Sequence, residues 1–255
     1  MQTVLIPLSF GALGKNNGTE LAPKAIANGL KLKAESAKID NLDIEKSHAN
    51  IEKTAHDCLK QKCFFLGGDH SLTYSTFRAF SRRFGKKNAV LVLLDAHADC
   101  TYFTSIKSHE DYVRALVEEG FLQPQNILML GTRHVWKNEK EFLKKKKIKT
   151  ISAKEIKKSL KKTSELLHKF LVGKKAVYVS IDFDVLDAKF AFATGYPEAN
   201  GLNEKELFAL LKVALQAHVR AVDFVEYNPL LDKQGKGQKT AEKIVRFVLR
   251  FGDCQ

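Results

Sequence analysis

The stretch 89-AVLVLLDAHAD-99 joins six consecutive apolar residues to a short segment that holds two aspartates and a histidine. A continuous run of Val and Leu is typical of a strand that is covered on both faces, as in a parallel sheet. Similar apolar runs predict further strands at residues 3–7, 63–66, 126–130, 148–151, 176–181 and 221–225. The stretch therefore predicts a buried strand that ends in residues able to carry chemistry.

Segments with helical periodicity lie between the predicted strands. One segment begins at Glu155 and has lysines opposite an apolar face formed by Ile156, Leu160, Leu167, Phe170 and Leu171. Near the C-terminus, a second apolar face is formed by Ala241, Ile244, Val245, Val248 and Leu249. Alternating strands and helices predict an α/β fold with a mostly parallel central sheet and helices on both sides. Since no linker divides the chain, we expect one domain over residues 1–255.

The composition limits the classes of protein to consider. The 42 Lys and Arg residues exceed the 29 Asp and Glu residues by 13, which raises the question of a nucleic-acid partner. The densest basic run, at residues 144–147, lacks interleaved aromatic side chains and continues into a helix with an apolar face. We therefore expect a solvated surface and no nucleic acid.

The same composition indicates the cellular setting. No apolar run approaches the ~18 residues that span a membrane, and the first ten residues lack a secretory pattern, so we expect no membrane. The four cysteines, Cys58, Cys63, Cys100 and Cys254, are too few and too scattered for a disulfide framework. Cys58 and Cys63 also lack the two-residue spacing of a zinc ribbon or redox pair. A reducing, cytoplasmic protein is the expectation.

Three of the predicted strands end in clusters of Asp and His, namely 67-GGDHS-71, 95-DAHAD-99 and 180-SIDFD-184. Ligands of open parallel sheets bind beyond the carboxyl ends of the strands, where all three clusters fall. In an extended segment, residues i and i+2 point the same way, so alternate polar residues can converge on one site. In the first cluster we expect His70 to face the site, because Asp69 beside two glycines can instead accept hydrogen bonds from turn amides.

Together these clusters predict a metal centre. Grouped carboxylates at the end of an apolar strand are costly to bury without a cation. A mixture of four Asp and two His fits Mn²⁺ better than a thiolate zinc site or a typical magnesium site. Six ligands are too many for one catalytic ion, so two ions with a water between them account for the number. The predicted metal ligands are His70, Asp95, His97, Asp99, Asp182 and Asp184.

The chain resembles the arginase/agmatinase (ureohydrolase) family in these motifs and in their order. The resemblance is carried by GGDHS, LLDAHADC, SIDFDVLDA, ATGYPEANGL and DFVEYNP, and it covers nearly the whole chain. It implies a three-layer α/β/α fold, two Mn²⁺ ions per subunit, and hydrolysis of a guanidino group to urea and an amine. It also implies a small guanidino substrate and a homo-oligomer, either a trimer or a hexamer.

The resemblance assigns roles to individual residues. One ion takes His70, Asp95, Asp99 and Asp182, and the other takes Asp95, His97, Asp182 and Asp184. Asp95 and Asp182 then bridge the two ions, and Asp99 also orients the water between them. Glu226 resembles the family glutamate that pairs with the guanidinium, the alternative being a surface salt bridge. His109 resembles the histidine that passes a proton to the leaving amine, the alternative being a surface histidine at a helix start.

The sequence departs from the family pattern where the substrate is recognised. Tyr196 replaces the usual threonine, Ala188 replaces a proline, and the loop at residues 100–107 is short. His134 and Trp136 follow the GTR motif where arginases have acidic residues. An agmatine-like substrate therefore fits no worse than arginine. Histidines without motif context, at positions 48, 56, 134, 168 and 218, are interpreted as structural or surface residues.

Two other functions stay open. The same two-ion chemistry could hydrolyse another bond, such as an amide, a formimino group or a phosphoester. A catalytically silent family member with a binding role is the second alternative.

Overall fold

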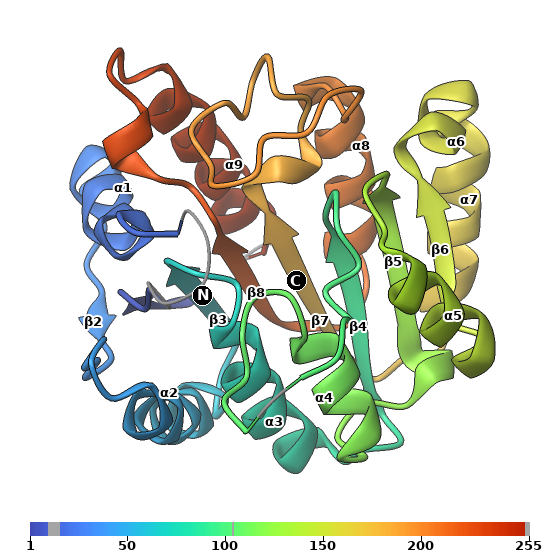
Figure 1. Ribbon diagram of the computed structural model, residues 1–255, viewed down its shortest axis with the longest axis horizontal. Coiled ribbons are helices and arrows are strands. Elements are labelled where there is room, and N and C mark those ends of the chain that lie inside the picture. The colour runs from blue at the N-terminus through green and yellow to red at the C-terminus, as the bar shows by residue number, and fades with distance from the viewer. Residues whose placement is uncertain (10–15, 104, 253–255) are drawn as a thin grey trace.

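One parallel sheet organises the structure, a computed structural model that describes residues 1–9, 16–103 and 105–252 (Figure 1). Within these residues eight strands pair in the order β2-β1-β3-β8-β7-β4-β5-β6, and every pairing is parallel. The strands are β1 (Gln2–Ile6), β2 (Glu35–Ser36), β3 (Cys63–Gly67), β4 (Ala89–Leu94), β5 (Ile127–Thr132), β6 (Lys149–Ser152), β7 (Ala176–Asp182) and β8 (Val219–Val225).

Seven of these strands confirm the sequence predictions to within two residues at each end. β2 was not predicted, because its two residues are exposed, lack an apolar run, and only extend the sheet beside β1. β4 shows why the predicted strands are continuously apolar. Its Val90, Val92 and Leu94 lie in one hydrophobic core and Leu91 and Leu93 in another, so the strand is covered on both faces.

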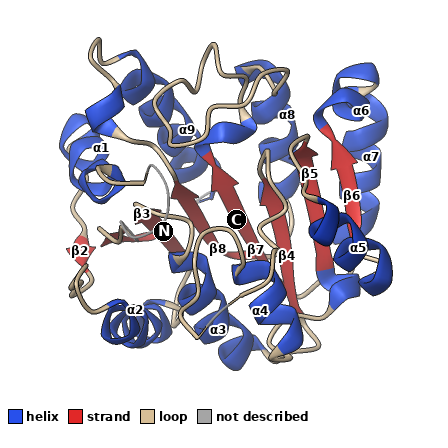
Figure 2. Cartoon of the chain, in the orientation of Figure 1, coloured by secondary structure: helices blue, strands red, loops and turns tan. Residues whose placement is uncertain are grey.

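Helices cover both faces of the sheet and complete the three-layer α/β/α fold (Figure 2). One core contains side chains from α1 (Ala22–Leu30), α6 (Ala153–Lys158), α7 (Leu160–Leu171), α8 (Glu204–Leu215) and α9 (Lys236–Gly252). The other contains side chains from α2 (Ile44–Cys58), α3 (Leu72–Phe84), α4 (Tyr112–Glu118) and α5 (Lys137–Lys146). The apolar face predicted at the C-terminus is the buried face of α9.

The helix expected from Glu155 onward is two helices, α6 and α7. Ser159 has φ −157° and ψ 85°, and its side chain accepts a hydrogen bond from the Lys162 amide, so it ends α6 and caps α7. Ile156 from α6 and Leu167 from α7 still pack into the same core. The apolar pattern was therefore correct about burial, but the serine was not recognised as a helix boundary.

The cysteines also differ from expectation. A disulfide joins Cys58, the last residue of α2, to Cys63, the first residue of β3, with their Cα atoms 6.0 Å apart. Cys100 is a buried free thiol, and Cys254 lies outside the described residues. A single link is not a framework, but the sequence analysis did not predict this disulfide. No helix in the described parts of the chain has the length and apolarity needed to cross a membrane.

The strand order brings the motif-bearing strands together. β3, β8, β7 and β4 are adjacent in the middle of the sheet, although β8 is last in sequence. Gly67 and Gly68, Asp95, Asp182 and Glu226 lie at the carboxyl ends of these four strands. Gly68 lets the turn after β3 lie against the backbone that follows β1, because a Cβ at Gly68 would collide with the carbonyl oxygen of Leu8. The centre of this edge is therefore where the candidate site forms.

Candidate metal centre

His70 is at the centre of the first group of possible metal ligands. Its Nδ1 lies 3.2 Å from Asp95 Oδ2, 3.2 Å from Asp99 Oδ2 and 3.0 Å from Asp182 Oδ2, and all four side chains are buried. These are the four residues that the sequence assigned to one ion. The structure therefore brings them together from three strand ends.

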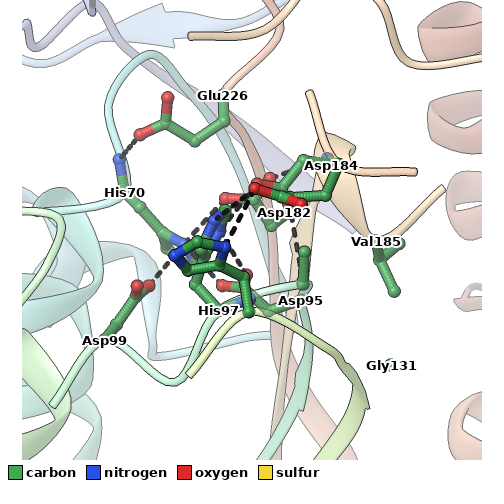
Figure 3. Close-up of polar contacts among 12 residues, drawn as sticks. His70, Asp95, His97, Asp99, Gly131, Asp182, Asp184, Val185 and Glu226 are labelled. Carbon is green, nitrogen blue, oxygen red and sulfur yellow. Dashed lines mark hydrogen bonds and ion pairs between the residues drawn. The ribbon is translucent and has the colours of Figure 1, made fainter. Parts of the chain in front are cut away.

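His97 is at the centre of a second group (Figure 3). Its Nδ1 lies 2.9 Å from Asp184 Oδ2 and 3.6 Å from Asp95 Oδ1. Potential ligand atoms of Asp95, His97 and Asp184 lie within 4.8 Å of one another, as do those of His70, Asp95 and Asp182. Asp95 belongs to both groups, whereas Asp182, the other carboxylate expected to bridge, belongs only to the first.

Turns, and not extended backbone, make these side chains converge. Asp99 has φ 48°, in the left-handed region, and Asp184 lies in the short 3₁₀ helix η3 (Phe183–Val185). The Asp184 amide donates to Asp182 Oδ1 at 2.7 Å, and the His97 amide donates to Asp95 Oδ1 at 2.6 Å. The i, i+2 argument therefore identified the converging residues and was correct about the extended backbone of Asp182, but Asp99 and Asp184 are not extended.

The electrostatics of the two groups fit a divalent cation. Burial, followed by the charges of neighbouring aspartates, raises the pKa of Asp99 and of Asp182 well above the ordinary range. His70 Nδ1 and Asp95 Oδ2 are both buried and make no hydrogen bond, although they lie 3.2 Å apart. Bound cations would remove this cost, since they attract both the carboxylates and the imidazole lone pairs. The mixed oxygen and nitrogen donors suit Mn²⁺.

A buried polar network orients His70 from behind. Its Nε2 lies 2.8 Å from Ser180 Oγ, and the Ser180 hydroxyl donates to Asp223 Oδ1 at 2.6 Å. Asp223 also accepts hydrogen bonds from Thr73 and Tyr178. Since Ser180 donates onward, His70 Nε2–H donates to Ser180, so Nδ1 faces the three aspartates and its lone pair can bind a cation that displaces the Nδ1 proton. The sequence analysis missed Asp223 because it considered polar residues that follow strand ends, whereas Asp223 lies inside a predicted strand.

Glu226 lies beside the metal groups and is 6% exposed. It accepts hydrogen bonds from the His70 amide at 2.7 Å and from Asn16 Nδ2 at 3.1 Å. Burial, together with the charge of Asp69, raises the pKa of Glu226 to about 8. Because Glu226 is buried, it is not a surface residue, and the alternative of a surface salt bridge is wrong. Its φ of 66° shows that the chain adopts an unfavourable conformation to present it.

His109 is also buried and faces the same cavity. Its Nδ1 lies 3.4 Å from Asp69 Oδ2. Burial lowers the pKa of His109, but the charge of Asp69, with smaller contributions from Glu226 and Asp99, outweighs burial and raises it to about 10. The alternative of a surface histidine is therefore wrong. Asp69 accepts from the Ser71 amide, as expected, and its contact with His109 is an additional role that the sequence analysis missed.

A cavity of about 480 Å³ contains these groups. Its described lining includes no Lys or Arg, although the chain is strongly basic. His134 is a partly exposed residue that also lines the cavity, with Nδ1 3.2 Å from Glu198 Oε1, which is a role that its interpretation as a structural or surface residue did not include. No motif indicated this role, which depends on the loop that carries Glu198. The lining residues are His70, His97, Asp99, Thr101, His109, Glu110, His134, Trp136, Asn138, Glu139, Asp182, Asp184, Thr194, Tyr196, Glu198 and Glu226.

Comparisons with known proteins identify the family. The family model described as the arginase family matches residues 2–251. The chain is 31% identical to an arginase of Staphylococcus aureus (strain COL) over 203 residues, 73% of this chain and 66% of that protein. It is 30% identical to an agmatinase of Neisseria gonorrhoeae over 192 residues, 74% of this chain and 59% of that protein.

The match thus spans about two thirds or less of the length of these relatives. Among solved structures, the proclavaminate amidino hydrolase of Streptomyces clavuligerus superposes with a TM-score of 0.89 and 25% identity, covering 98% of this chain and 91% of that one. The fold, the order of the motifs and the family match lead to the same conclusion: the chain belongs to the arginase family.

Proposed function

We propose that this protein is a manganese-dependent hydrolase that converts a guanidino compound and water to urea and an amine. The observation that carries the proposal is the position of Glu226, a buried carboxylate in the same cavity as two His–Asp groups that share Asp95. Proteins of this family hydrolyse amidino C–N bonds, and its members include both arginases and agmatinases.

Two Mn²⁺ ions would be held by the ligand sets already described, with His70 and Asp99 on one side and His97 and Asp184 on the other. When bound, such ions supply a nucleophile from water near neutral pH and stabilise charge that develops on the substrate. The assignment is supported by His70 Nδ1 and Asp95 Oδ2, which are buried and make no hydrogen bond.

Glu226 is suited to bind the guanidinium group. A planar cation with paired N–H donors matches a carboxylate in bidentate geometry. The hydrogen bonds from the His70 amide and Asn16 fix one oxygen of Glu226, so its position is set before substrate enters. An incoming cation also favours the ionised form of a carboxyl group whose pKa is raised to about 8.

His109 is suited to donate a proton to the leaving amine. A pKa of about 10 keeps the imidazole protonated at neutral pH. Because Asp69 faces Nδ1, the Nε2–H of His109 is the proton available for the leaving nitrogen. Asp99, opposite His70, can accept a hydrogen bond from the attacking water and orient it.

A urea-release screen tests the proposal. Purified protein loaded with Mn²⁺ is assayed for urea with arginine, agmatine, 4-guanidinobutyrate and 3-guanidinopropionate, and for formamide with formiminoglutamate. Metal content is measured in parallel. We expect two Mn²⁺ per chain and urea from at least one guanidino compound. Folded, metal-loaded protein that releases no urea from any of them would refute the proposal.

Two substitutions test the ligand assignment in the same assay. His97→Ala and Asp99→Asn should abolish urea release and lower the metal content. The matched controls are His56→Ala and Asp57→Asn, a neighbouring His and Asp at the exposed end of α2. Variants of His97 and Asp99 that keep wild-type turnover would overturn the assignment.

The cytoplasmic location and the trimeric or hexameric assembly remain predictions. Sedimentation of the purified protein tests the assembly directly.

A further inference from the structure

The ring of Tyr196 lies between two imidazoles of the candidate site. It is nearly parallel to His109, with centroids 6.1 Å apart and planes at 29°, and edge-on to His97, with centroids 6.3 Å apart and planes at 77°. Tyr196 is half-buried and lines the cavity. The ring is therefore next to both the histidine proposed as the proton donor and a proposed metal ligand.

Arg133 holds the loop that carries Tyr196 in place. Its guanidinium donates to the backbone carbonyls of Glu198 and Ala199, each at 2.9 Å, and to that of Asp184 at 2.7 Å. The loop after Tyr196 is thus attached to the backbone of a proposed metal ligand. The position of the Tyr196 ring relative to the site is therefore set by the fold and not by the loop alone.

We propose that Tyr196 is a specificity-determining residue that limits the cavity next to the reacting carbon to guanidinium groups on slim, unbranched chains. This inference rests on the proposed function. The guanidinium must lie near Glu226 and between the groups centred on His97 and His70, which is the space that the Tyr196 ring borders. A flat guanidinium can pack against an aromatic face. A branch on the carbon bonded to the guanidino nitrogen would collide with that ring.

Kinetic selectivity tests the inference. An unbranched ω-guanidino alkylamine is compared with the same compound methylated on the carbon that bears the guanidino group. The wild-type protein should prefer the unbranched compound by roughly tenfold or more in kcat/KM. Tyr196→Phe should keep this ratio because it keeps the ring. Tyr196→Thr should bring the ratio close to one, mainly by improving KM for the branched compound.

The control variant is Phe192→Thr, which removes a ring of similar size from the same loop. Phe192 is partly exposed and is not among the described residues that line the cavity. The selectivity ratio of the Phe192→Thr variant should match that of the wild type. An unchanged ratio in Tyr196→Thr, or an equal loss of selectivity in Phe192→Thr, would overturn the inference.

A binding measurement separates this inference from the proposed function. Trp136 is the single tryptophan of the chain, lines the cavity and contacts His134 edge-on, so its fluorescence reports ligand entry. Mn²⁺-loaded protein is mixed with each guanidino compound in a stopped-flow instrument, so that binding is measured before turnover. The wild type and Tyr196→Phe should bind the unbranched compound more tightly, and Tyr196→Thr should not discriminate. If no urea is released but this pattern holds, the proposed reaction fails and the role of Tyr196 stands.

Discussion

Asp69 Oδ2 lies 3.4 Å from Nδ1 of His109, and this contact joins the carboxyl end of β3 to the segment that precedes α4. The same carboxylate accepts a hydrogen bond from Asn16 Nδ2 at 2.7 Å, and the same Asn16 nitrogen donates to Glu226. The proposed proton donor and the proposed guanidinium-binding residue are therefore positioned by one buried network. That network gives separate predictions for its members.

Substitution at His109 or Asp69 should slow the reaction without removing metal. His109→Ala removes the proton donor, and Asp69→Asn removes the charge that keeps the imidazole protonated. We expect kcat to fall by roughly 10²–10⁴-fold for His109→Ala and less for Asp69→Asn. Turnover and metal content are measured together, with His56→Ala as the control. Loss of metal from His109→Ala would mean that His109 is a ligand and not a proton donor.

Ser180→Ala should weaken metal binding without touching a ligand. The substitution removes the hydroxyl 2.8 Å from His70 Nε2 and breaks the link to Asp223. Because such partners fix the orientation of a ligating imidazole, Mn²⁺ affinity should fall by about 10–100-fold. Calorimetric titration with Mn²⁺ measures the change. The control is Ser164→Ala in α7, a half-buried serine that is not among the described residues that line the cavity. Wild-type affinity in Ser180→Ala would exclude an orienting role.

Mn²⁺ affinity should increase with pH. Burial lowers the pKa of His70 and of His97, but the carboxylates around them outweigh burial and hold both values well above the ordinary histidine value. Without metal both imidazoles are therefore protonated near neutral pH, and each cation must displace a proton. Affinity should rise by up to about tenfold per pH unit for each proton displaced. Titration in two buffers of different ionisation enthalpy detects the released protons, and a metal affinity independent of pH from 6 to 9 would contradict this.

Glu226 stores conformational strain that glycine would relieve. Its φ of 66° is unfavourable for a residue with a Cβ. Glu226→Gly should therefore be more stable than Glu226→Ala by about 1 kcal/mol in free energy of unfolding, while both variants lose activity. Urea denaturation of the two variants gives the difference. Equal stability would show that the left-handed conformation costs nothing here.

Much of the architecture could be predicted from local sequence. Short apolar runs predicted seven strands, and several of these runs are continuous because a strand covered on both faces is apolar throughout, as Val92 and Leu93 show on opposite faces of β4. The helical periodicity predicted which residues are buried, but it did not predict that one helix ends and another begins at Ser159. The two-residue β2 had no local pattern to find.

The candidate site was predictable in its residues but not in its geometry. The six metal-ligand candidates and Glu226 follow strand ends, whereas His109 lies in the loop that precedes α4. All of them except Asp95 line one cavity, and Asp95 contacts the lining residues His70 and His97. The backbone conformations of Asp99 and Glu226 could not be read from the sequence, because a left-handed φ in a residue other than glycine persists only when tertiary contacts hold it.

The sequence by itself determined the strands, the reactive residues at their ends and the family, since each depends on periodicity or on a contiguous motif. Only the tertiary structure decided that β8 lies between β3 and β7, which brings Glu226 beside His70 across more than 150 residues. It also paired Asp69 with His109 and placed Tyr196 between His109 and His97. The physical reason is that such contacts arise from the packing order of the sheet and its loops, whereas local patterns record only whether each segment is buried.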